Sequence, residues 1–98
     1  MADLVLDTVT REVVRGSMSL SLTRTEYSLL ERLMSRAGGV VTREFLMESV
    51  WGLDREVENN TLDVFVRLLR AKVDGAGDQK LIHTIRGVGY MIRGGTQL

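Results

Sequence analysis

The sequence has no cysteine and a single histidine, His83. Without cysteine there is no disulfide framework and no thiolate metal site, and one histidine excludes metal sites built from several. No apolar run approaches the roughly 20 residues of a membrane span, and no signal-peptide pattern opens the chain. We therefore expect a cytoplasmic protein that contacts no membrane and holds neither a metal nor another cofactor.

Catalytic motifs are also lacking. The chain contains no Gly-x-Ser-x-Gly elbow, no phosphate-binding loop and no paired-carboxylate motif. Its Gly87-Val88-Gly89 segment lacks the third glycine of a dinucleotide fingerprint, and no helix is expected after it. We therefore predict that the protein is not an enzyme.

The composition indicates one globular domain with an uneven charge distribution. The 98 residues are 44% apolar and 27% charged, which argues against disorder. The net charge is zero, but residues 1–59 carry −3 and residues 60–98 carry +3. The C-terminal part is the candidate for contact with a polyanion, although chance alone also produces an excess this small.

The N-terminal part predicts an antiparallel β-meander followed by two helices. Residues 4–7, 12–15 and 18–22 are short β-type runs separated by turns. A capping box at residues 23–26 begins the first helix, which the Gly38-Gly39 pair is expected to end. Thr42 is the expected N-cap of a second helix, and Gly52 its end.

The third helix is expected over residues 59–73, capped by Asn59 or Asn60. Asp63 and Arg67 lie four residues apart, at the spacing of an intrahelical ion pair. The outer face of this helix carries few charges for a solvated surface, so it is suited to lie against another molecule. An ordinary core helix with its outer face in water is an equally consistent interpretation. The outer residues are Asn60, Val64, Arg67 and Ala71, with Leu68 beside them.

The C-terminal segment predicts a β-hairpin of residues 81–86 and 90–93 around a glycine-rich turn. Arg86 then lies at the tip, next to a glycine that lets the backbone approach a surface closely. Arg86 is suited to a minor groove or a phosphate. A tight hairpin with a solvated arginine remains the alternative.

Helices two and three followed by the hairpin have the order of a helix-turn-helix with a wing. In that arrangement the third helix lies in the major groove of DNA. Asn60, Thr61, Val64 and Arg67 are the base-contacting candidates. Arg70 and Lys72 flank this face, where phosphates would lie.

Four segments carry a family resemblance that covers almost the whole chain. They are TRTEYSLLERLM at 23–34, VTREFLMESVWG at 41–52, NTLDVFVRLLRAK at 60–72 and IHTIRGVGY at 82–90. Together they resemble the C-terminal winged-helix effector domain of OmpR/PhoB-type bacterial response regulators. The resemblance implies an α+β winged helix-turn-helix in a single domain, residues 1–98. Its parts are an N-terminal antiparallel β-meander (1–22), a three-helix core (23–74) and a C-terminal hairpin wing (81–93).

The resemblance also implies roles for particular residues. It supports the four base-contacting candidates and Arg70 as a phosphate contact. Residues expected at the DNA backbone or minor groove are Thr42, Arg43, Thr84, Arg86, Gly87 and Tyr90. The loop expected to contact RNA polymerase comprises Leu53, Asp54, Arg55, Glu56, Val57 and Glu58.

The implied function is sequence-specific binding of double-stranded DNA for transcriptional regulation, as the output domain of a two-component response regulator. We expect the receiver domain to be absent from this chain, the isolated domain to be a monomer, and dimers to form on tandem half-sites. Asn60, Leu68 and Ala71 stand where relatives often carry polar or basic residues, which predicts weak binding by the isolated domain. The alternative is a winged-helix module that acts through protein contacts with RNA polymerase or a partner regulator.

Overall fold

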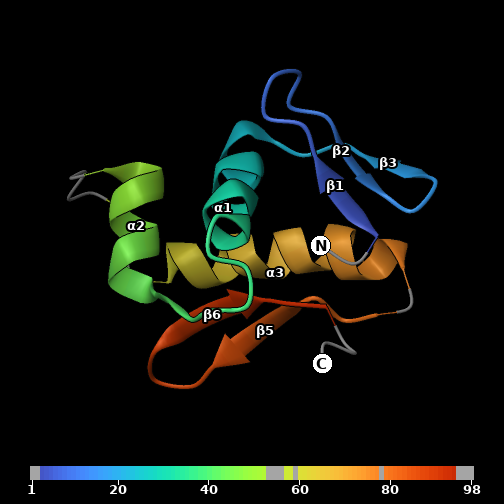
Figure 1. Cartoon of the computed structure of the whole chain (residues 1–98). Helices are drawn as coiled ribbons and strands as arrows, with labels where there is room; N and C mark the ends of the chain where they lie inside the picture. The colour runs from blue at the N-terminus through green and yellow to red at the C-terminus, as the bar shows by residue number, and fades with distance from the viewer. Residues whose placement is uncertain (1–2, 53–56, 59, 78, 95–98) are drawn as a thin grey trace.

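The computed structural model describes residues 3–52, 57–58, 60–77 and 79–94. Three α-helices lie between two small antiparallel sheets (Figure 1). Within the described residues, no helix has the length and apolar character needed to cross a bilayer. The elements in chain order are β1 (Leu4–Leu6), β2 (Val13–Arg15), β3 (Met18–Leu20), α1 (Arg24–Met34), β4 (Val41–Thr42), α2 (Arg43–Trp51), α3 (Thr61–Val73), the 3₁₀ turn η1 (Asp74–Ala76), β5 (Ile82–Ile85) and β6 (Gly89–Ile92).

The predicted N-terminal meander is present. Strands pair in the order β1-β2-β3, with Leu4 opposite Arg15 and Val13 opposite Leu20. Leu4 and Val13 are buried in the core, while Val5 on the alternate face of β1 is exposed, as expected for a sheet with one buried face. The meander packs over one end of the helical layer (Figure 1).

Helix α1 begins as predicted and ends earlier than predicted. The Thr23 hydroxyl accepts the Glu26 N–H, and the Glu26 carboxylate accepts the Thr23 N–H, which completes the capping box. The helix ends at Met34 and not at Gly38-Gly39. The next residues tighten into i→i−3 turns, since such bonds satisfy the last carbonyls of a helix without extending it. Gly38, with φ of 88°, then donates its N–H to the carbonyl of Ile92.

The C-terminal sheet has one strand more than the sequence predicted. The two-residue strand β4 joins the hairpin, which gives the order β4-β6-β5. Two residues are too few for a recognisable alternating pattern, so only the tertiary pairing reveals β4. The pairing places the start of α2 directly beside the hairpin (Figure 1).

One hydrophobic core joins the helices to both sheets. The inner face of α3 contributes four fully buried or nearly fully buried residues, Leu62, Val66, Leu69 and Val73. These pack with buried leucines of α1 and with Ile92 of β6. Because each buried leucine contributes about 1.5–3 kcal/mol relative to an exposed one, this packing fixes which side of α3 faces outward.

Candidate nucleic-acid interface

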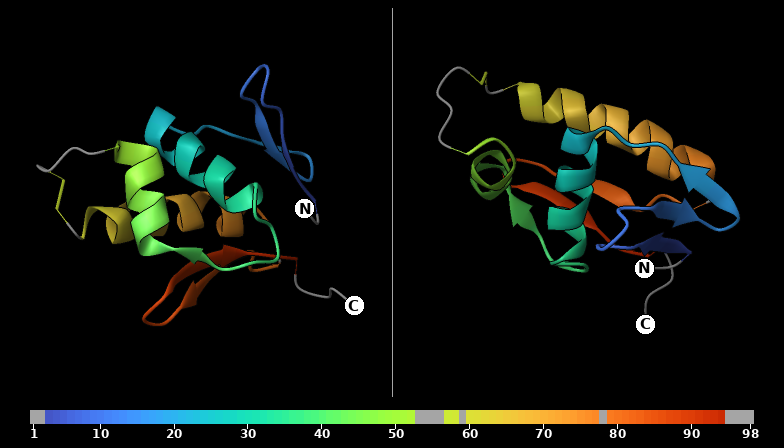
Figure 2. Two further views of the ribbon diagram at one scale, coloured as in Figure 1. Left: turned by 60° about the vertical axis from the view of Figure 1, so that its left-hand side comes forward. Right: turned by 90° about the horizontal axis from the view of Figure 1, so that it is seen from above.

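The outer face of α3 is open along its length. Seen from above, α3 lies along one edge of the molecule, with no other ribbon outside it (Figure 2). Asn60, Val64 and Arg67 are exposed and Thr61 is half-buried. The four base-contacting candidates therefore lie on one accessible surface, next to the wing.

The start of α3 differs from the predicted cap. Asn60 occupies the N-cap position, but its side chain forms no capping hydrogen bond and its backbone is already helical, with φ of −80° and ψ of −6°. The alternative cap, Asn59, lies outside the described residues. Backbone bonds close the turn, from Thr61 N–H to the carbonyl of Glu58 and from Val64 N–H to that of Asn60. The exposed Asn60 amide is thus not used in capping this helix.

Asp63 links α3 to both α2 and the wing. Its Oδ1 accepts a hydrogen bond from Arg43 Nη1 at 2.5 Å and another from the hydroxyl of Tyr90. Asp63 lies at the spacing of an ion pair with Arg67, but its Oδ1 bonds these two other residues, because the buried face of α3 turns Asp63 toward α2 and β6. The same contacts occupy two of the predicted DNA-backbone residues, Arg43 and Tyr90.

The ionisable groups in this cluster shift one another's pKa. The hydrogen bond from Arg43, followed by that from Tyr90, lowers the pKa of Asp63 below its ordinary value. The hydrogen bond to Asp63 raises the pKa of Arg43. Burial, followed by the hydrogen bond to Asp63, raises the pKa of Tyr90. At neutral pH the cluster therefore contains a carboxylate, a guanidinium and a neutral phenol.

Helix α2 is attached to the wing at its first residue. The Thr42 hydroxyl accepts the Phe45 N–H as the predicted N-cap, and the Arg43 N–H donates to the carbonyl of Val88. Gly89 makes this approach possible, since a Cβ there would lie 1.9 Å from the carbonyl oxygen of Val41. Thr42, a predicted backbone contact, is exposed at this junction.

Two other residues that were predicted to contact phosphates bond α3 to neighbouring parts of the fold. Arg70 Nη2 donates to Thr84 Oγ1 on β5 at 2.8 Å. Lys72 Nζ donates to Glu26 Oε1 at 2.7 Å and to the carbonyl of Ser21 at 2.9 Å. Burial opposes ionisation of Glu26, but the contacts with Lys72 and Thr23 outweigh it and lower the pKa of Glu26.

The wing tip presents the predicted cation. Arg86, Gly87 and Val88 are exposed in the turn between β5 and β6. Gly87 has a φ of 75°, a left-handed conformation that favours glycine. The Val88 N–H closes the turn on the carbonyl of Ile85.

His83 is less exposed than predicted. We expected a surface residue on a strand, but its side chain is half-buried and its Nε2 is buried without a hydrogen-bond partner. His83 lies on β5 opposite Met91 of β6.

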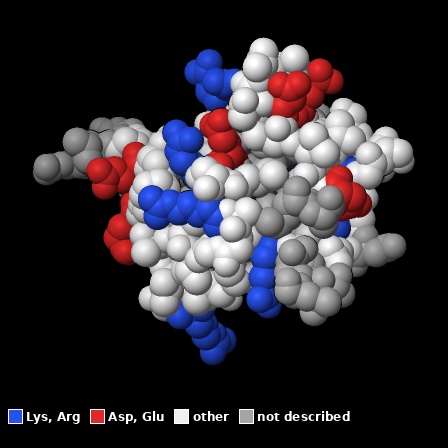
Figure 3. All heavy atoms as spheres, in the orientation of Figure 1, with Lys and Arg blue, Asp and Glu red and all other residues white. Residues whose placement is uncertain are grey.

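On the face drawn in Figure 3, the described cations do not form one continuous patch. Basic side chains on this face are separated by neutral surface, and acidic ones lie over the meander and near α2. In the predicted polymerase-contact loop, Leu53, Asp54, Arg55 and Glu56 lie outside the described residues. Val57 is half-buried and Glu58 is exposed. This face thus favours a contact with a few defined charges over a broad basic footprint.

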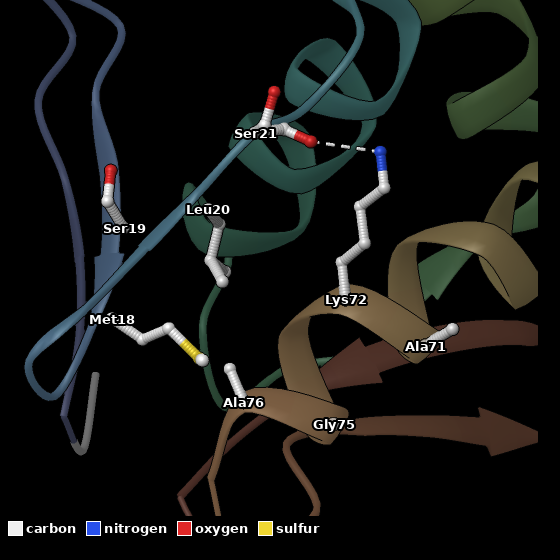
Figure 4. Close-up of a pocket in the computed structure, with 8 residues that line it drawn as sticks. All are labelled: Met18, Ser19, Leu20, Ser21, Ala71, Lys72, Gly75 and Ala76. Carbon is white, nitrogen blue, oxygen red and sulfur yellow. Dashed lines mark hydrogen bonds between the residues drawn. The ribbon is translucent and has the colours of Figure 1, made fainter.

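A shallow hollow lies between β3 and the end of α3. Figure 4 shows Lys72 crossing its upper side to the carbonyl of Ser21. Among the described residues, no group of three or more histidine or acidic side chains is placed to hold a metal ion. The hollow is lined by Met18, Ser19, Leu20, Ser21, Ala71, Lys72, Gly75 and Ala76.

Sequence reasoning missed two polar residues that hold the interface in place. Asp63 was considered only as a partner of Arg67. Arg15 was treated as part of a strand, yet its side chain is 1% exposed and donates to the carbonyls of Val73 and Gln79, both at 2.5 Å. Arg15 Nε also donates to Asp3 at 3.1 Å. No local pattern identifies Asp63 or Arg15, because all their other partners are distant in the sequence.

The three helices, the meander and the hairpin wing define a winged helix-turn-helix protein, which confirms the predicted fold class. A family model described as the C-terminal domain of transcriptional regulatory proteins matches residues 17–92. The chain belongs to this family, the DNA-binding domains of OmpR/PhoB-type response regulators. The family consists of transcriptional regulators, so the prediction that the chain is not an enzyme is confirmed.

Relatives and solved structures agree with this assignment. The chain is 52% identical over 91 residues to response regulator MprA of Mycobacterium sp. (strain KMS). The aligned region covers 93% of this chain and 40% of that relative. The DNA-binding domain of response regulator AdeR, solved with an intercistronic region, superimposes with a TM-score of 0.84 at 29% identity, over 95% of this chain and 96% of that one. The RstA DNA-binding domain of Klebsiella pneumoniae, solved with the RstA box, gives 0.80 at 26% identity, over 93% and 91%.

Proposed function

We propose that this chain binds double-stranded DNA sequence-specifically, with α3 in the major groove and the turn between β5 and β6 on the backbone or in the minor groove. The observation that carries the proposal is the accessible outer face of α3, whose orientation is fixed by a fully buried inner face and by the Asp63 contacts. A major groove admits one helix and offers a distinct donor and acceptor pattern for each base pair.

Within this interface the residues divide into reading and supporting groups. Asn60, Thr61, Val64 and Arg67 contact base edges, since all four lie on the outer side of α3. Arg86 and Gly87 approach the backbone or the minor groove from the wing, and Thr42 approaches a phosphate from α2. The supporting group holds the elements together through the contacts described above, and it bonds phosphates only through donor groups that those contacts do not use. Its members are Arg43, Arg70, Lys72, Thr84 and Tyr90.

The full-length protein is proposed to be a two-component response regulator of the cytoplasm. The chain spans 40% of the length of the curated relatives it matches, which leaves room for a receiver domain. We propose that the receiver controls dimerisation on tandem half-sites, that the isolated domain is a monomer, and that RNA polymerase is contacted through residues 53–58.

Selection of duplexes from a random pool, followed by affinity measurements on variants, tests the proposal. Arg67→Ala and Arg86→Ala both weaken binding, but only Arg67→Ala relaxes the base preference, because phosphate contacts carry little sequence information. Arg93→Ala is the matched control, since Arg93 is exposed just after β6, at the end of the hairpin opposite Arg86.

The salt dependence supplies an independent measure. The logarithm of the association constant should fall with the logarithm of salt concentration by about 0.9 for each phosphate neutralised, and Arg86→Ala should reduce the slope by about one contact. Affinity that does not respond to salt, or a selection that enriches no sequence, would contradict sequence-specific DNA binding.

A second candidate function is docking of a protein partner on the N-terminal sheet. Val5 and Met18 are 63% and 55% exposed on this sheet, and the hollow beside β3 adds apolar surface. Chemical-shift titration separates the two functions. Protein docking is favoured if duplex DNA leaves the α3 signals unchanged while RNA polymerase fragments shift those of β1 and β3.

A further inference from the structure

The outer side of α3 exposes two aliphatic side chains that the core does not use. Val64 is 40% exposed and Leu68 is 46% exposed. A leucine on this outer side serves either to cover the wing or a loop, or to offer an apolar contact to a base. Its exposure in the folded chain leaves close to half of its surface for a contact outside the domain.

Val64 and Leu68 form part of a narrow strip along the helix. At 100° per residue, Thr61, Val64, Leu68 and Ala71 fall within about 80° of arc. Val64 and Leu68 are four residues apart, so they are separated by about 6 Å along the axis. This separation corresponds to about two base steps, since the rise per base on one strand is 3.4 Å.

The charges around this strip favour a polyanion over an apolar protein surface. Arg67 is exposed beside the strip, and Arg70 lies further round the helix on the same side, where it bonds Thr84. The acidic residue of α3, Asp63, already has its Oδ1 bonded to Arg43 and Tyr90. A nucleic acid is therefore the occupant that suits both the exposed cation and the aliphatic groups beside it.

We propose that Leu68, together with Val64, reads the C5-methyl groups of thymines spaced about two base steps apart in the half-site. The inference rests on the proposed DNA binding and adds the base class selected by these positions. Thymine is the only base that presents a methyl group in the major groove. A leucine offers no hydrogen bond, so any other base edge placed against it loses water without compensation. The aliphatic pair thus both favours thymine and disfavours its competitors.

Replacing thymine by deoxyuridine tests the inference, because this change removes the methyl group and keeps the base-pairing edge. The duplex comes from selection with the wild-type chain, and each thymine of the half-site is replaced in turn. Removing a contacted methyl should weaken binding about fourfold, equivalent to about 0.8 kcal/mol. Two positions should respond, separated by about two steps.

Variants assign each response to a side chain. In Leu68→Ala, deoxyuridine at one of the two positions should no longer weaken binding, and in Val64→Ala the same should hold at the other. Both variants are expected to fold, since alanine favours helix. Val5→Ala, which removes methyl groups from an exposed valine of the meander, is the matched control and should keep both responses.

The outcomes distinguish the inference from the proposed function. If a selected duplex binds but deoxyuridine has no effect, or has the same effect in Leu68→Ala, the methyl readout is overturned while DNA binding stands. Self-association that sedimentation detects and Leu68→Ala abolishes would assign the strip to a second copy and also overturn the inference. If selection enriches no duplex, the proposed function itself fails.

Discussion

The contact between Asp63 and Tyr90 should couple the stability of the domain to its DNA specificity. Two single variants, Asp63→Asn and Tyr90→Phe, and their combination form a thermodynamic cycle. Each single change keeps the shape of the side chain and removes only the charge or only the hydroxyl. Any coupling therefore reports the hydrogen bond between α3 and β6.

The structure sets the expected size of this coupling. A hydrogen bond to a charged group contributes about 1.5–3 kcal/mol. Tyr90 is buried but the Asp63 side chain is 43% exposed, and solvent screening reduces the value. We expect a coupling free energy of about 1 kcal/mol, measured by urea unfolding at neutral pH, and a decrease of about 4–8 °C in Tm for each kcal/mol lost.

Acid should remove this coupling. The pKa of Asp63 is lowered in the folded state, by Arg43 first and by Tyr90 second. Because the folded-state pKa lies below the ordinary value of 3.8, the stabilisation is present above that value and is lost as pH falls through the folded-state pKa. Additive effects of the two changes at neutral pH, to within about 0.3 kcal/mol, would refute the reasoning.

The same variants should affect DNA binding differently. Tyr90→Phe changes no charge, so it should weaken binding to the selected site only by loosening α3. Asp63→Asn also removes a negative charge from the surface that is proposed to face the phosphates. It should therefore bind random duplex somewhat more tightly while the ratio of specific to random affinity falls. An unchanged ratio in both variants would show that the contact does not position α3 for reading.

Three further predictions concern the supporting contacts. Gly89→Ala should cost about 3 kcal/mol or more of unfolding free energy, since its Cβ would lie 1.9 Å from a carbonyl oxygen of β4; a wild-type midpoint in urea would contradict the close approach. Arg15→Met should cost about 2–4 kcal/mol by leaving the buried Val73 carbonyl without its donor, whereas the control Arg32→Met, on a half-exposed side chain, should change stability by less than about 0.5 kcal/mol. Burial and the hydrogen bond to Asp63 raise the pKa of Tyr90 above 10.0, so the stability that the neutral Tyr90 hydroxyl gives the fold is complete below that value and decreases as pH rises through the folded-state pKa. The free energy of unfolding measured across this range should therefore fall in the wild type, and Tyr90→Phe should lack this fall.

The sequence predicted most of the elements because their signals are local. The capping box at Thr23 and Glu26 and the N-cap Thr42 lie within one helical turn of the groups they bond. The apolar spacing of residues 59–73 was enough to identify the buried side of α3, and hence its outer side. Where the local signal was weak, the prediction failed: β4 is too short to show a pattern, and α1 ends before the glycines expected to end it.

The contacts of the interface could not be predicted in the same way. Asp63 was given the partner that its own helix offers at four residues, but folding brings Arg43 and Tyr90, 20 and 27 residues away, to the same carboxylate oxygen. Arg15 looked like an ordinary strand residue until its guanidinium was found between carbonyls 58 and 64 residues away. Long-range partners leave no periodic trace in the sequence.

The sequence by itself determined the family, the order of the elements and the face of α3 that is available for reading. These follow from helix periodicity, capping residues and a glycine-rich hairpin, all of which act over a few residues. Only the tertiary structure decided which cations hold the fold together, which remain exposed beside the aliphatic strip, and that Leu68 covers neither the wing nor a loop completely. Side-chain partnership across the core depends on distances in space, and the chain establishes those only when its helices and sheets pack.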